Sequence, residues 1–102
     1  MVDRAEALKI LQESRNKIDG IDEKIISLII KRTSLARDIV NAKIVLGMDI
    51  EDKKREGYIQ YKTKRIAEQK QIDENYLKKI MKILTDLNKK EQKKILGREI
   101  NG

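Results

Sequence analysis

The chain has 102 residues, enough for one small domain but too few for two independent hydrophobic cores. It contains no proline, phenylalanine or tryptophan and is rich in Lys, Glu, Ile and Leu, which is the composition of long helices. The absence of cysteine and histidine excludes a disulfide framework, thiolate chemistry and catalysis by a Ser-His or Cys-His pair. We therefore expect a single all-α domain over residues 1–102.

The net charge of +7 fits two kinds of partner. Clustered Lys and Arg bind nucleic acid by releasing counterions from phosphates, whereas the same positive potential attracts a small anionic substrate. Charges of both signs are mixed along the chain, and three tyrosines are its only aromatic residues, too few to alternate regularly with the basic ones and stack on bases. We therefore expect a small anionic ligand and no nucleic acid. A basic nucleic-acid-binding or structural coiled coil is the more distant alternative.

Neither a signal peptide nor a membrane span is predicted. The N-terminus, Met1–Glu6, lacks an apolar run, and no segment approaches about 18 uncharged apolar residues. The expected location is the cytoplasm, with no membrane partner.

An apolar row organises the first half of the chain. Its alternating spacing of three and four residues predicts one long helix over residues 4–46, ended by Gly47 as a C-terminal cap. The row consists of Leu11, Ser14, Ile18, Ile21, Ile25, Leu28, Arg32, Leu35, Ile39, Ala42 and Leu46. Arg32 interrupts it, and because a guanidinium keeps its charge, burying Arg32 requires an anion from the protein or from a ligand.

The length of this helix predicts a second copy of the chain. The helix would be about 65 Å long, whereas a compact domain of this size has a radius of gyration of about 13 Å. The other half of the chain cannot cover such a helix, so a second copy must. Gly20 inside the helix costs about 1 kcal/mol relative to alanine, and close approach of a neighbour is the one reason that the sequence suggests.

Two shorter helices are expected to follow, over residues 50–69 and 74–96. Asp49 is the expected N-cap of the first of these and Asp73 of the second. The last helix has an apolar stripe that is continued by two amides four residues apart. The stripe consists of Leu77, Ile80, Met81, Leu84, Leu87 and Ile95, and the amides are Asn88 and Gln92.

Three basic residues of the long helix have informative positions. Arg32 and Lys43 are 11 residues apart, almost a whole number of turns, so they share a helix face with about 16 Å between their backbones. Two long side chains on that face can close on a molecule between them. Arg15 lies about 25 Å before Arg32 and is rotated by about 100°, so it cannot join the same small pocket. If Arg15 is functional, it serves a partner's site, which predicts two chains that exchange long helices and build two shared sites.

At these positions the sequence resembles the all-helical chorismate mutases, the AroQ class. The resemblance rests on the spacing of Arg15, Arg32, Lys43, Asp52, Arg55, Glu56, Asn88 and Gln92. The strings Arg15-Asn-Lys-Ile-Asp-Gly-Ile-Asp-Glu-Lys-Ile and Lys31-Arg32-Thr-Ser-Leu-Ala also resemble the opening and the mid-helix signature of the family. The match covers nearly the whole chain.

The resemblance implies a homodimer of three-helix chains, intertwined as a helical bundle, that converts chorismate to prephenate on the route to phenylalanine and tyrosine. This Claisen rearrangement is a concerted shift of electrons within one molecule, so it needs no nucleophile, metal or cofactor. The enzyme has to hold a dicarboxylate in its reactive shape and stabilise the negative charge that builds on the ether oxygen.

The resemblance also implies the catalytic roles. Arg32 and Arg15 of the partner subunit would each bind a substrate carboxylate with a planar guanidinium. Lys43 and Gln92 would donate hydrogen bonds to the ether oxygen. Glu56 would accept a hydrogen bond from the substrate hydroxyl.

Three further substrate-binding positions follow from the same resemblance. Asp52 would fix the hydroxyl end together with Glu56, Arg55 would neutralise and orient this acidic pair, and Asn88 would hydrogen-bond a carboxylate. Two other reactions on the same fold remain alternatives, those of isochorismate pyruvate lyase and of aminodeoxychorismate mutase. A carboxylate that accepts from a hydroxyl favours chorismate as the substrate.

Overall fold

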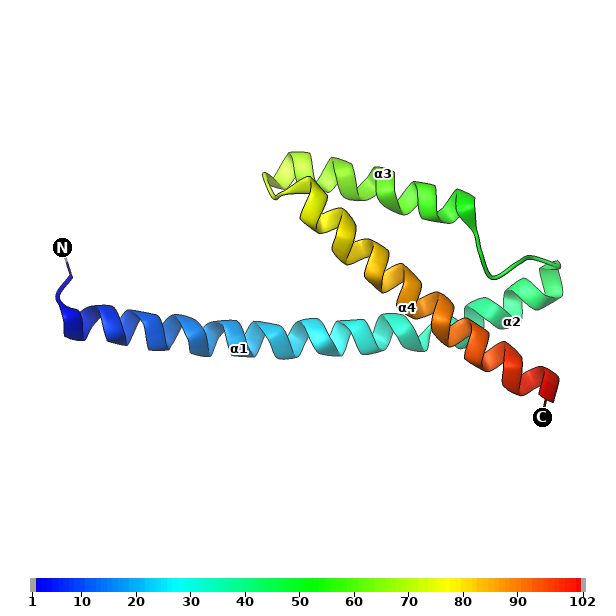
Figure 1. The fold of residues 1–102 in the computed structure, drawn as a ribbon, viewed down its shortest axis with the longest axis horizontal. Coiled ribbons are helices and arrows are strands. Elements are labelled where there is room, and N and C mark those ends of the chain that lie inside the picture. The colour runs from blue at the N-terminus through cyan, green and yellow to red at the C-terminus, as the bar shows by residue number, and fades with distance from the viewer. Residues whose placement is uncertain (1, 102) are drawn as a thin grey trace. The chain divides into compact units, whose positions relative to one another are not determined.

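The computed structural model describes residues 2–101. Over this range the chain forms four α-helices and no strand, as Figure 1 shows, which confirms the all-α prediction. The helices are α1 (Arg4–Ser34), α2 (Ala36–Leu46), α3 (Lys53–Lys70) and α4 (Glu74–Asn101). They belong to two compact units, Met1–Lys31 and Arg32–Gly102. None of the four helices has the length and apolarity needed to span a bilayer.

The first unit consists mainly of α1. Asp3 caps the start of this helix, because its carboxylate accepts a hydrogen bond of 2.8 Å from the backbone nitrogen of Glu6. No residue of α1 is buried, so the predicted apolar row lies open to solvent. The exposed apolar side chains are Leu8, Ile10, Leu11, Ile18, Ile21, Ile25, Ile26, Leu28 and Ile30. A helix gains most of its stability by packing such a face against another element.

The predicted helix over residues 4–46 is present as α1 and α2, which are separated at Leu35. Leu35 keeps right-handed helical dihedrals, φ −71° and ψ −12°, and its carbonyl still accepts a hydrogen bond from the nitrogen of Ile39. The end of α2 is as predicted, because Gly47 adopts φ 66° and forms the left-handed cap. A hydrogen bond of 2.8 Å from the nitrogen of Met48 to the carbonyl of Lys43 completes this cap.

The prediction of Asp49 as an N-cap is wrong. Asp52 caps α3, and its Oδ1 accepts a hydrogen bond of 3.0 Å from the nitrogen of Arg55. The helix starts at Lys53 because Ile50 is held in the preceding loop, where its side chain packs against the small core and its carbonyl accepts from a lysine. A helix from residue 50 would remove both contacts.

The last helix has the predicted start and a later end than expected. Asp73 is its N-cap, with Oδ1 accepting a hydrogen bond of 3.0 Å from the nitrogen of Tyr76. The helix continues through Gly97 as far as Asn101, because a glycine ends a helix only where the backbone adopts the left-handed conformation, as Gly47 does here.

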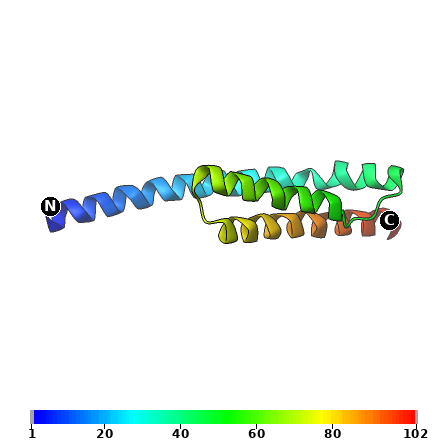
Figure 2. The same cartoon turned by 90° about the horizontal axis from the view of Figure 1, so that it is seen from above.

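Within the second unit, α4 packs against both α3 and α2, and α3 and α4 run antiparallel (Figures 1 and 2). The buried apolar cluster is small: Ala36, Val40 and Ile95, with Ile50 and Leu96 packed against it. The buried residues of α2 are therefore Ala36, Val40 and Lys43, spaced four and three residues apart. They differ from the predicted row, whose Leu35, Ile39 and Leu46 are exposed, because α4 covers a neighbouring face of α2.

Candidate active site

A cavity of about 310 Å³ lies in the second unit, between the last turn of α1 and helices α2, α3 and α4. Seven of the eight predicted site residues line it: Arg32, Lys43, Asp52, Arg55, Glu56, Asn88 and Gln92. The rest of the wall consists of Leu35, Ile39, Ile50, Ile59, Thr85 and Lys89. The eighth predicted residue, Arg15, belongs to the first unit, where it is exposed.

The charges of the cavity wall favour a doubly negative ligand. The cationic side chains are Arg32, Lys43, Arg55 and Lys89, and the anionic ones are Asp52 and Glu56. The wall thus has two more positive than negative charges. This excess of positive charge attracts a ligand with two negative charges and stabilises it in the partly enclosed cavity.

Arg32 lies half-buried in this wall. Its Nη1 donates a hydrogen bond of 2.8 Å to the carbonyl of Leu84, and no carboxylate among the described residues forms an ion pair with it. Burial, and then the positive charge of Arg55, lower the pKa of the Arg32 guanidinium from its usual value. An arginine nevertheless stays protonated at neutral pH. An anion bound at this guanidinium would offset both the cost of burying its charge and the repulsion from Arg55.

A chain of hydrogen bonds fixes the two predicted donors to the ether oxygen. Lys43 and Gln92 are buried, with 9% and 3% of their surface exposed. The Lys43 Nζ donates to Oε1 of Gln92 at 3.0 Å and to the carbonyl of Ile50. The Gln92 Nε2 in turn donates to Oδ1 of Asn88 at 2.8 Å, and Nδ2 of Asn88 donates to the carbonyl of Arg32 at 3.0 Å.

These bonds leave one donor on each of the two groups. An ammonium has three protons and an amide nitrogen has two. Within residues 2–101, two of the Lys43 protons and one Nε2 proton of Gln92 have acceptors. Both groups line the cavity, so the remaining two protons are available to a ligand bound there. Lys43 also lies in the last turn of α2, where a cation is favourable.

The acidic corner differs from the sequence prediction. The cation that pairs with Glu56 is Lys89, whose Nζ lies 3.0 Å from Oε1. Arg55, the residue expected to neutralise this carboxylate, instead has its guanidinium 5.1 Å from the centre of the Tyr58 ring. Asp52 accepts from the start of α3 as its N-cap. The other carboxylate oxygen of Glu56, Oε2, is buried without a hydrogen-bond partner among the described residues.

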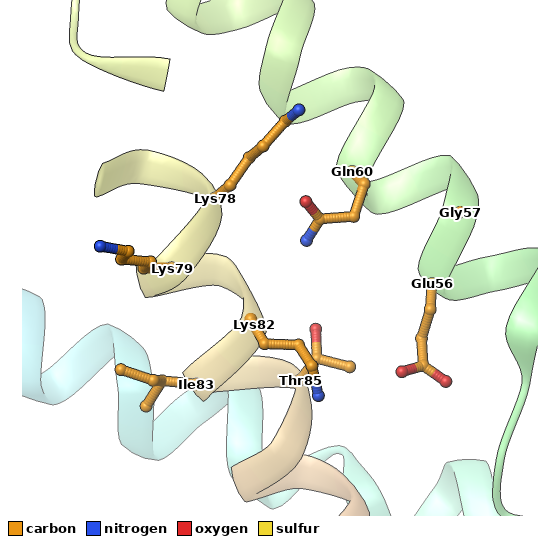
Figure 3. A pocket seen from close by; sticks show the side chains of 8 residues that line it. All are labelled: Glu56, Gly57, Gln60, Lys78, Lys79, Lys82, Ile83 and Thr85. Atoms are coloured by element: carbon orange, nitrogen blue, oxygen red, sulfur yellow. The ribbon is translucent and has the colours of Figure 1, made fainter. Parts of the chain in front are cut away.

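A second, more open cavity of about 690 Å³ lies between α3 and α4. Glu56 and Thr85 line both cavities, and Figure 3 shows the Glu56 carboxylate extending from α3 toward α4. The other lining residues are Gly57, Gln60, Lys78, Lys79, Lys82 and Ile83. Three of its six polar lining residues are lysines, none of them buried, so this cavity lacks the buried lysine and amide donors of the first one.

The family model for chorismate mutase type II matches residues 14–93, most of the chain. The chain belongs to the chorismate mutase type II family. A chorismate mutase of Methanocaldococcus jannaschii is 44% identical to it over 86 residues, which cover 84% of this chain and 87% of that protein. A bifunctional chorismate mutase/prephenate dehydratase of Buchnera aphidicola is 28% identical over 87 residues, covering 85% of this chain but 23% of that longer protein.

The part of the chain that matches the chorismate mutase family includes all eight predicted site residues. Sequence reasoning missed two polar residues of the wall, Lys89 and Thr85. Lys89 directly follows Asn88 and could have been noticed for that reason, but it is one of many lysines in α4. Thr85 donates its hydroxyl to the carbonyl of Met81, so its polar group is satisfied within the helix.

Proposed function

We propose that this chain catalyses the rearrangement of chorismate to prephenate in the cavity of the second unit. The observation that carries the proposal is the buried Lys43–Gln92 pair, which retains two unused protons at a wall with two excess positive charges. In this reaction a carbon–oxygen bond breaks as a carbon–carbon bond forms within one molecule. The protein therefore has to orient a dicarboxylate and stabilise developing negative charge.

Arg32 is the proposed anchor for one substrate carboxylate. Its guanidinium lacks a carboxylate partner within the described chain and has Arg55 as a positive neighbour, so a bound carboxylate improves its environment. Lys43 and Gln92 donate to the ether oxygen, where the negative charge grows in the transition state. Because the hydrogen bonds between them already fix both groups, little reorganisation is needed when that charge appears.

Glu56 is the proposed acceptor for the substrate hydroxyl. Its buried Oε2 has no donor within the described residues, and leaving such an oxygen unpaired is costly. A hydroxyl proton from the substrate supplies the missing hydrogen bond. Asp52 and Arg55 bound the same end of the cavity, while Asn88 has one amide proton left for a carboxylate after its bond to α1.

We also propose that the active form is a homodimer with exchanged helices, in which Arg15 of the partner subunit completes each site. The support is the exposed apolar row of α1 together with a buried core too small to stabilise a domain by itself. Each cavity then binds the second carboxylate through the partner's Arg15. The three-helix arrangement within one domain of 102 residues and the cytoplasmic location stay predictions.

One incubation tests the reaction. Purified protein is mixed with chorismate, the loss of the ring diene absorbance is followed, and the product is identified by chromatography and mass spectrometry. Prephenate supports the proposal. If chorismate stays unchanged, the same incubation is repeated with isochorismate and with aminodeoxychorismate. Turnover of one of these would assign the chain to the corresponding alternative reaction.

A mixing experiment tests the shared sites. Arg15→Ala chains and Lys43→Met chains are each expected to be inactive, because each lacks one group at every site. After the two are unfolded and refolded together, mixed dimers contain one intact site, and part of the activity should return. If refolding restores no activity while size measurements show mixed dimers, Arg15 does not act across the interface.

A further inference from the structure

The ion pair between Lys89 and Glu56 carries an inference that rests on the proposed function and deepens it. Lys89 belongs to α4 and Glu56 to α3, so the pair links these two helices at the wall of the 310 Å³ cavity. The Nζ–Oε1 distance is 3.0 Å, and the side chains are only 18% and 22% exposed. A pair shielded from water in this way is less screened by salt than an exposed one.

Lys89 forms ion pairs with three carboxylates, and among the described residues Glu56 is the one that lies within hydrogen-bond distance. Two other acidic groups lie near its Nζ, Glu51 at 3.7 Å and Asp86 at 3.8 Å, both beyond hydrogen-bond distance. These two side chains are 62% and 50% exposed, and Asp86 already accepts a hydrogen bond of 2.6 Å from Lys82. The hydrogen bond that Lys89 donates to Glu56 is the largest cause of the raised pKa of Lys89, so the ammonium stays charged through neutral pH.

The other charged groups of the cavity wall are engaged elsewhere. Arg32 donates to a backbone carbonyl of α4, and Lys43 donates to a side-chain amide and to a loop carbonyl. The guanidinium of Arg55 lies over the ring of Tyr58, and Asp52 caps α3. None of these groups forms a hydrogen bond to Glu56 within the described chain, which leaves Lys89 as the group that orients it.

We propose that Lys89 is the positioning residue for Glu56: its ammonium holds Oε1 in place, so that Oε2 is directed to the substrate hydroxyl. Oε2 has no donor within the described residues, so it can accept the hydrogen bond of that hydroxyl. Lys89 thus affects the reaction through Glu56 and touches no reacting atom.

Lys89→Met keeps the length of the side chain and removes its charge. We expect kcat/KM for chorismate to fall about 10- to 100-fold, the usual range for losing a hydrogen bond to a charged group. Lys89→Arg, which keeps a cation at this position, should restore most of the activity. The matched control is Lys90→Met, which changes the exposed neighbour of Lys89 in the same helix and should stay within about twofold of wild type.

A double-mutant cycle separates positioning from a general effect on the fold. If Lys89 acts through Glu56, Lys89→Met should change kcat/KM by less than about twofold in a Glu56→Gln background. An equal loss in both backgrounds would overturn the proposal. Circular dichroism checks that the variants fold. If Lys89→Met does not fold, Lys89→Gln, which keeps a donor without the charge, replaces it in the cycle.

The outcomes distinguish this inference from the proposed function. A wild-type protein that does not turn over chorismate removes the basis of both. An active wild type with equal kcat/KM for Lys89→Met and Lys90→Met refutes the positioning role alone. An active wild type whose kcat/KM falls in Lys89→Met, returns in Lys89→Arg and is insensitive to Lys89→Met in the Glu56→Gln background supports both.

Discussion

Replacing Lys43 by methionine tests the central electrostatic contribution to the proposed reaction. Lys43→Met preserves the length of a side chain that is only 9% exposed, so it removes the ammonium without opening a large cavity. The ammonium donates to Gln92 and to the carbonyl of Ile50 and retains one proton for the substrate. Its loss therefore removes one donor to the ether oxygen and releases the amide that provides the other.

The expected loss follows from the cost of removing one preorganised donor, about 3 to 4 kcal/mol, or a 10²- to 10³-fold lower kcat. Loosening of the Gln92 amide places the expected result toward the upper end of that range. The assay is the loss of chorismate absorbance at saturating substrate, with Lys93→Met as an exposed control in α4. A loss below tenfold, with helix content and thermal midpoint unchanged, would refute the role of Lys43 in stabilising the transition state.

Four further results are expected. Activity should be nearly constant between pH 6 and about 8, because the chain has no histidine and the donors in the site are an ammonium and a neutral amide. A steep change in the pH–activity profile over this range would show that another titrating group is essential. Asn88→Ala should lower kcat about tenfold, since Gln92 loses the acceptor that orients its amide, and steady-state kinetics with equal thermal midpoints would show this. Glu56 raises the pKa of Lys89 above its usual 10.5, so the stability that this ion pair contributes is complete below about pH 10.5 and is lost as the pH rises through the raised pKa. The thermal midpoint should therefore fall above about pH 10.5, and this fall should be smaller in Lys89→Met. Gly20→Ala should raise the free energy of unfolding by about 1 kcal/mol in chemical denaturation, because a Cβ at this position meets nothing within 4 Å; destabilisation would indicate that another chain comes close there.

Local signals in the sequence determined the helices. Helix-forming composition and the spacing of apolar residues predicted an all-α chain, Gly47 marked the end of α2, and Asp73 marked the start of α4. These signals act over a few residues, so the sequence reports them directly. Asp49 and Asp52 show the limit of this reasoning, because both fit the capping pattern and the long-range contacts of Ile50 decide between them.

The candidate site combines residues chosen from the sequence with contacts that only the tertiary structure decides. The resemblance to the family selected eight residues, and seven of them line the cavity. Five of these seven are cations or amides that can donate to an anion, and two are carboxylates. The pairing of Lys89 with Glu56 could not be predicted, since it depends on how α4 lies against α3 and many lysines of α4 offered the same charge. Packing likewise buries Ala36 and Val40, because helix α4 covers only the face of α2 that its own position reaches.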